Sequence, residues 1–229
     1  MVFTAFSGSH QDAIKKCLAR RKDDEPWQVA YLPIDPADIG RSYQEVIRIN
    51  SQSGKGGMAY VLEREYGLEL PRWLQIDFSS VVQAYAEEHK TEVGGAELYR
   101  LFEQHYLACE QGMTLERFSV ERAGAENVTV SAVINDGAQS RTINGKGGGV
   151  VSAFVTAMQP LSREKIVLVE YSEHALSHSA DAEAVSYIQL NLGGERYCGV
   201  GRSHDIVQAS LSAILGAMNK AALENTQAA

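Results

Sequence analysis

The chain has 229 residues, 45% of them hydrophobic and 22% charged, which is ordinary for a folded protein with one large or two small domains. Its formal net charge of −8 argues against nucleic acid or an anionic membrane as a partner, because both attract clustered Lys and Arg. The three cysteines are widely spaced and lack metal-ligand spacing, which is typical of a reducing compartment. We also find no apolar run near the ~20 residues that cross a bilayer and no signal-peptide pattern, so we expect a cytoplasmic location.

The first part of the chain carries one clear helix signal. Ser9 followed by Asp12 has the S-x-x-D form of a capping box and predicts a helix that ends before the polar stretch from Lys22. The Pro-, Gly- and Asp-rich segment 27–57 that follows predicts extended connections with one short helix near 43–49.

Two amphipathic helices are predicted next. Apolar residues at i, i+4, i+7, i+8 and i+11 predict the first, which begins near Trp73. Its apolar positions are Leu74, Phe78, Val81, Val82 and Tyr85. Gly94-Gly95 separates it from the second, in which Leu98, Leu101 and Phe102 share a face.

After about Gly112 the pattern changes to period-2 strands and then repeats. Each repeat predicts three strands, a glycine turn and a helix. The strands are predicted at 115–122, 127–135 and 138–144, then at 166–171, 184–192 and 196–198; the turns are Gly145-Lys146-Gly147 and Gly199-Val200-Gly201. The fold class is therefore α+β, with a mainly helical segment 1–111 and a duplicated βββα module at 112–229. Because one helix cannot cover both faces of a three-stranded sheet, the repeats should pack on each other and on a second chain.

Two aromatic residues near the start are candidate proton-transfer groups. His10 lies in the first turn of the predicted helix, where the helix dipole disfavours the imidazolium and leaves a neutral ring able to accept a proton. Tyr31 lies between prolines that restrict the backbone, and its phenol could donate a hydrogen bond to a developing oxyanion. The structural alternatives are a surface histidine at a helix start and a packed aromatic.

Lysine and histidine patterns give two weaker candidates. The segment 51–57 looks like a phosphate loop, but Gly56 follows Lys55 where a P-loop needs Ser or Thr. Lys55 could still contact coenzyme phosphates, or the segment could be a tight connection. His174, His178 and His204 could be imagined as metal ligands, although we expect no metal site in this chain.

Three segments taken together resemble a known family. These are S-G-S-H-Q-D at 7–12, Y-L-P-I-D at 31–35 and the Gly-rich segment 50–57. In this order and spacing they resemble the region that follows the catalytic barrel of 2-isopropylmalate synthases, and the resemblance covers nearly the whole chain. It implies that His10 and Tyr31 are catalytic groups that reach a barrel active site, commonly that of the partner subunit.

The resemblance also implies a function for the parent enzyme. That enzyme condenses acetyl-CoA with 2-oxoisovalerate, as the acyl transfer that opens leucine biosynthesis. Its divalent metal and its oxo-acid pocket lie in the barrel, which this chain lacks. The chain itself should hold no cofactor and should be inactive as a synthase.

The duplicated module is implied to be a regulatory, dimerisation domain that binds leucine between two subunits and mediates feedback inhibition. A glycine turn before a helix exposes unpaired N–H groups that suit a carboxylate. The implied leucine-binding residues are Gly147, Gly149, Val151, Ser152, Tyr171, Ala175, Ala182 and Ile206. Two alternatives stay open: a related citramalate or homocitrate synthase, the former responding to isoleucine, or a stand-alone amino-acid sensor without catalysis.

Overall fold

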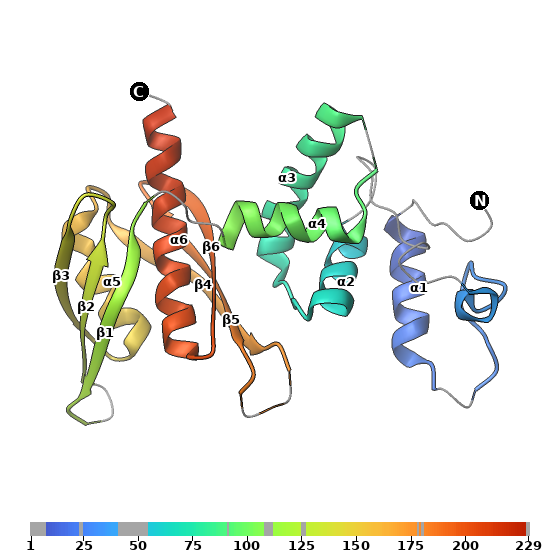
Figure 1. The fold of residues 1–229 in the computed structure, drawn as a ribbon, viewed down its shortest axis with the longest axis horizontal. Helices are drawn as coiled ribbons and strands as arrows, with labels where there is room; N and C mark the ends of the chain where they lie inside the picture. The colour runs from blue at the N-terminus through green and yellow to red at the C-terminus, as the bar shows by residue number, and fades with distance from the viewer. Residues whose placement is uncertain are drawn as a thin grey trace. The chain divides into compact units, whose positions relative to one another are not determined.

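The computed structural model describes residues 8–22, 25–40, 55–90, 92–107, 112–124, 127–177, 179 and 181–227. The chain forms two compact units, Met1–Phe102 and Glu103–Ala229 (Figure 1). The α+β class and the duplicated βββα module are both confirmed. The division between the units falls earlier than the expected boundary after residue 111. The reason is that the short π-helix η3 (Glu103–Leu107) belongs to the second unit: it contacts the strand Glu195–Ser203, and its buried Tyr106 has the ammonium group of Lys220 over its ring.

The first unit is helical. Its elements are α1 (Gly8–Arg20), a 3₁₀ turn η1 (Pro36–Ile39), α2 (Lys55–Tyr66), α3 (Arg72–His89) and α4 (Gly95–Phe102). The helices α3 and α4 confirm the two amphipathic predictions, and Phe78 meets Phe102 edge to face at 5.4 Å between ring centroids. The helix predicted near 43–49 lies outside the described residues.

Helix α2 differs from the expectation, because Gly56 and Gly57 lie in a helix where the sequence predicts a connection. Each glycine costs helix stability. The helix nevertheless forms because its apolar residues are buried in the first unit: Met58, Ala59, Val61 and Leu62. Tertiary burial here outweighs local propensity.

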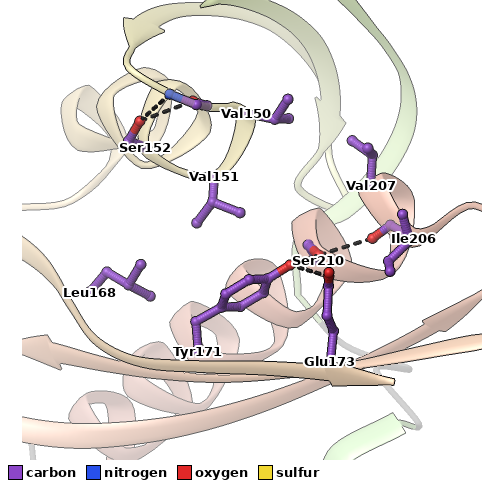
Figure 2. A pocket seen from close by; sticks show the side chains of 10 residues that line it. Val150, Val151, Ser152, Leu168, Tyr171, Glu173, Ile206, Val207 and Ser210 are labelled. Atoms are coloured by element: carbon purple, nitrogen blue, oxygen red, sulfur yellow. Dashed lines mark hydrogen bonds between the residues drawn. The ribbon is translucent and has the colours of Figure 1, made fainter. Parts of the chain in front are cut away.

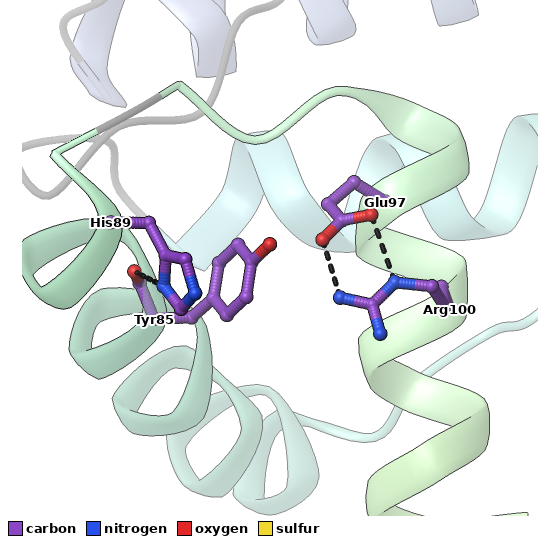
Figure 3. A network of polar contacts seen from close by, with 4 residues as sticks. All are labelled: Tyr85, His89, Glu97 and Arg100. Carbon is purple, nitrogen blue, oxygen red and sulfur yellow. Dashed lines mark hydrogen bonds and ion pairs between the residues drawn. The ribbon is translucent and has the colours of Figure 1, made fainter.

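A network of polar contacts joins α3 to α4 (Figure 3). The guanidinium group of Arg100 donates to Glu97 through Nε at 2.9 Å and Nη2 at 2.5 Å, and it lies 5.8 Å from the ring of Tyr85. The bonds from Arg100, followed by one from Tyr85, lower the pKa of Glu97 to about 2. The imidazole of His89 stacks on Tyr85 at 4.1 Å, which extends the network along α3.

The second unit is built from two antiparallel three-stranded sheets and two helices. The first repeat comprises β1 (Thr114–Arg122), β2 (Val128–Asn135), β3 (Ser140–Gly147) and α5 (Val150–Met158); the second, after a short turn η4 (Gln159–Leu161), comprises β4 (Ile166–Ala175), β5 (Ala184–Leu192), β6 (Glu195–Ser203) and α6 (Ile206–Gln227). Helix α5 packs on β2 and β3, α6 packs on β5 and β6, and the helices contact each other. One apolar core therefore joins both repeats.

Two details confirm that the second repeat copies the first. Each opening strand carries a β-bulge near its start, after Leu115 in β1 and after Leu168 in β4. Each closing strand carries a glycine that faces its helix. A Cβ on Gly145 would lie 2.1 Å from the Ala153 carbonyl oxygen, and one on Gly199 would lie 2.0 Å from that of Ala213. Close approach of helix to strand explains these glycines.

This packing corrects the prediction of two glycine turns. Gly199 and Gly201 lie inside β6, and Gly145 and Gly147 lie inside β3, so neither pair forms the corner before a helix. The strands β4 and β6 are also longer than predicted. The connection to α5 runs instead through Gly148-Gly149, and the one to α6 through His204-Asp205.

Helix α6 is a further difference, because its window Ile206–Glu224 is long and apolar enough to cross a membrane by length and composition. From the sequence we expected no such run. In the second unit 61% of this window is buried against the sheet, as in the core helix of a globular domain.

Candidate functional site

A cavity of about 420 Å³ lies in the second unit, where the starts of α5 and α6 meet β4 (Figure 2). Its volume is in the range of small-molecule pockets. The structure brings together five predicted leucine-binding residues that are far apart in the sequence. The cavity is lined by Gly149, Val150, Val151, Ser152, Leu168, Tyr171, Glu173, Ile206, Val207 and Ser210.

Three predicted residues do not line this cavity. Gly147 is the last residue of β3, and a Cβ there would lie 2.4 Å from Ser152 Oγ, so it serves close packing. Ala175 ends β4, and Ala182 lies in the connection to β5, where its N–H donates to the Ser179 carbonyl oxygen.

Sequence reasoning missed several lining residues. Glu173 follows Tyr171 by two positions, so strand alternation alone could have found it. Leu168 stands three positions before Tyr171 and reaches the same face only because of the bulge in β4. Ser210 is one helical turn beyond Ile206, a signal available once the start of α6 is known.

The two helix starts at the cavity differ in charge. At α6, Asp205 Oδ1 accepts hydrogen bonds from the N–H groups of Val207 at 2.8 Å and Gln208 at 3.4 Å. Among the described residues no carboxylate caps α5; there Ser152 Oγ accepts from the Gly149 N–H at 3.0 Å. The positive end of α5 therefore remains available to an anion, whereas that of α6 is neutralised.

A chain of polar groups connects β4 to α6 on the other side of the cavity. The Tyr171 hydroxyl donates to Glu173 Oε2 and lies 3.1 Å from Ser210 Oγ, which in turn lies 2.8 Å from Ser186 Oγ. Burial, followed by the bond to Glu173, raises the pKa of Tyr171 above its usual value. The phenol therefore stays protonated and acts as a donor at neutral pH.

In the first unit, the two predicted catalytic residues lie in contact. The rings of His10 and Tyr31 stack, with centroids 4.1 Å apart and planes inclined by 29°. Tyr31 is 59% exposed at a tight turn between the buried Val29 and Leu32, and its φ of 63° is unusual for a residue with a side chain. The pair presents an imidazole and a phenol to the solvent on one surface.

The turn that carries Tyr31 is held by Trp27 and Arg21. The indole N–H of Trp27 donates to the Leu32 carbonyl oxygen at 2.7 Å. Arg21 lies over the Trp27 ring, with Cζ 4.9 Å from its centroid, and its Nη1 is 3.9 Å from Asp35 Oδ2. These contacts fix both sides of the turn to the residue after α1.

The remaining candidates gain no support from the geometry. Lys55 opens α2, and its side chain lies outside the described part of the chain. His178 is also outside it, whereas His174 stacks on Tyr187 and His204 Nδ1 lies 3.0 Å from the Asp181 carbonyl oxygen. Within the described ranges no group of three or more His, Cys, Asp or Glu side chains is placed to hold a metal ion.

Two family models match the chain. "Alpha-isopropylmalate synthase, post-catalytic domain-like" matches residues 1–63, and "LeuA allosteric (dimerisation) domain" matches residues 92–222. Similar relatives are the 2-isopropylmalate synthases of Alcanivorax borkumensis, 43% identical over 96% of this chain, and of Rhodospirillum rubrum, 45% identical over 96%. The chain spans 39% and 40% of their respective lengths. The chain therefore belongs to the 2-isopropylmalate synthase family, of which it carries the post-catalytic segment and the allosteric (dimerisation) domain.

Proposed function

We propose that the cavity between α5, β4 and α6 binds leucine and that this binding regulates a 2-isopropylmalate synthase. The open start of α5 suits the leucine carboxylate, because unpaired backbone N–H groups and the helix dipole both favour an anion. The isobutyl group would lie among the apolar side chains of Val151, Leu168 and Ile206. The observation that carries the proposal is the contrast between α5, which has no capping carboxylate among the described residues, and α6, which is already capped by Asp205.

The proposal includes a second copy of the chain. Strand β4 is at the edge of its sheet, and Val167, Leu168 and Tyr171 are exposed along it next to the cavity. Exposed apolar edge strands are usually covered by a partner. The description of the matching family as a dimerisation domain supports coverage by an identical subunit, so that leucine would bind close to the subunit interface.

The role proposed for the first unit is to contribute His10 and Tyr31 to the condensation of acetyl-CoA with 2-oxoisovalerate. A neutral imidazole can accept a proton from a carbon acid or a water molecule, and a phenol can donate to a developing oxyanion. Their stacking on one exposed surface supports a joint role. The metal and the oxo-acid pocket are expected in a barrel, so the 229-residue chain alone should release no CoA from these substrates.

Thermal unfolding with leucine, isoleucine or valine at equal concentration tests the effector site. A ligand at ~100 times its Kd should stabilise the fold by ~2.7 kcal/mol, and leucine should give the largest rise in Tm. Val151→Phe fills the cavity and should abolish the rise, whereas Leu223→Phe adds a ring at an exposed position outside the cavity and should not. A larger rise with isoleucine would favour the citramalate branch, and no rise with any of the three would refute the site.

A further inference from the structure

The two repeats differ in polarity at equivalent positions. Counted from the bulge in each opening strand, Phe118 of β1 corresponds to Tyr171 of β4, and Val120 corresponds to Glu173. The cross-strand partners of Val120 and Glu173 are Val130 and Ser186. The first repeat is thus apolar where the second has a phenol, a carboxylate and a hydroxyl. Since the apolar version of the repeat folds, the polar groups serve something other than the fold.

The polar groups of the second repeat make four contacts but have only three hydroxyl protons to donate. The contacts join Tyr171 to Glu173, Tyr171 to Ser210, Ser186 to Ser210, and Ser210 to the Ile206 carbonyl oxygen at 2.9 Å. Only the three hydroxyl groups supply protons. When Tyr171 donates to Glu173 and Ser210 donates to the Ile206 carbonyl oxygen, Ser186 donates its proton to Ser210. No proton is then left for the contact between Tyr171 and Ser210. The Tyr171 proton can therefore bond either Glu173 or Ser210.

We infer that Glu173 receives the ammonium group of the bound amino acid, and that Tyr171 then donates to Ser210 instead. This rests on the proposed leucine site. An ammonium group supplies three donors, so it replaces the phenol at Glu173 and supplies the proton that the network lacks. The start of α5 and Glu173 approach the cavity from different elements, one for each charge of an α-amino acid (Figure 2).

The inference explains how the site would distinguish leucine from the 2-oxo acid that has the same carbon skeleton. A branched 2-oxo acid has the same carboxylate and side chain as the amino acid but a carbonyl oxygen in place of the ammonium group. That oxygen carries no proton and is repelled by a carboxylate, so Glu173 would exclude it. The bond gained between Tyr171 on β4 and Ser210 on α6 would connect ligand binding to the central helix of the unit.

Isothermal titration calorimetry of the 229-residue chain with leucine and with 4-methyl-2-oxopentanoate tests the inference. Glu173→Gln should weaken leucine binding about 30-fold, or about 2 kcal/mol at about 1.4 kcal/mol per tenfold, and should strengthen binding of the oxo acid, because the repelling charge is gone. Glu170→Gln makes the same change of charge on β4 outside the cavity and should alter neither affinity. Ser210→Ala should weaken leucine binding about threefold and leave oxo-acid binding unchanged, since only the ammonium group releases the Tyr171 proton.

Equal losses for both ligands in Glu173→Gln, or no loss for leucine, would overturn the role of Glu173. The result for the unchanged chain separates the two proposals. If it binds leucine but Glu173→Gln does so equally well, only the ammonium site fails. If it binds no leucine, the effector site itself fails.

Discussion

Asn219 of α6 fixes the residue directly before β1, and its removal gives the most direct stability prediction. The side chain is 4% exposed. Its Oδ1 accepts the Met113 N–H at 2.8 Å, and its Nδ2 donates to the Met113 carbonyl oxygen at 2.9 Å. Gly112 makes this contact possible, because its φ is +121° and a Cβ there would lie 2.6 Å from Asn219 Cγ.

The cost of Asn219→Ala follows from these two bonds. The substitution leaves one donor and one acceptor of Met113 without their side-chain partner, and each such group costs about 1–3 kcal/mol when water cannot replace the bond. Met113 is only partly buried, which places the total near the low end, about 2–3 kcal/mol. At about 4 °C per kcal/mol for a unit of this size, the Tm of the second unit should fall by about 10 °C.

Urea unfolding followed by circular dichroism measures the change. The midpoint should fall with an unchanged m-value, because the surface exposed on unfolding stays the same. The control is Asn144→Ala on β3, an exposed asparagine, whose effect should stay within about 0.5 kcal/mol. An Asn219→Ala protein as stable as the control would show that water replaces both bonds and that the contact between Asn219 and Met113 does not stabilise the unit.

Two further stability predictions concern the helix–strand contact and the α3–α4 network. Gly199→Ala should lower the urea midpoint of the second unit severely or prevent folding, because its Cβ would lie 2.0 Å from the Ala213 carbonyl oxygen. The control Gly148→Ala has open space around it and should fold normally. Equal midpoints for the two variants would contradict the close packing of α6 on Gly199. Folding lowers the pKa of Glu97 from 4.5 to about 2, so its contribution to stability should be complete above about pH 4.5 and lost as the pH falls toward about 2. Glu97→Gln should remove this part of the pH dependence in urea titrations of the first unit; an unchanged profile would show that solvent screens the pair.

The local patterns that predicted correctly are those in which periodicity and burial agree. The helix α3 and the strand β2 carry their apolar residues at spacings of 3.6 and 2, and the structure buries those same faces. The duplication was visible for the same reason, since both repeats bury equivalent positions. His10 and Tyr31, singled out from short motifs, stay predicted catalytic residues, and the structure adds that their rings stack.

Only the tertiary structure revealed the features that depend on residues close in space but distant in the sequence. Glycine in Gly199-Val200-Gly201 predicts a turn by local propensity, yet the strand needs it because α6 leaves no room for a Cβ. Leu168 joins the cavity only through a bulge that shifts the strand by one residue, and Ser210 joins it because the fold brings α6 within hydrogen-bond distance of Tyr171 on β4. Sequence by itself determined which residues are apolar, which are polar and at what period they recur. Which of them share a cavity depended on close packing between segments distant along the chain, and no local pattern records that packing.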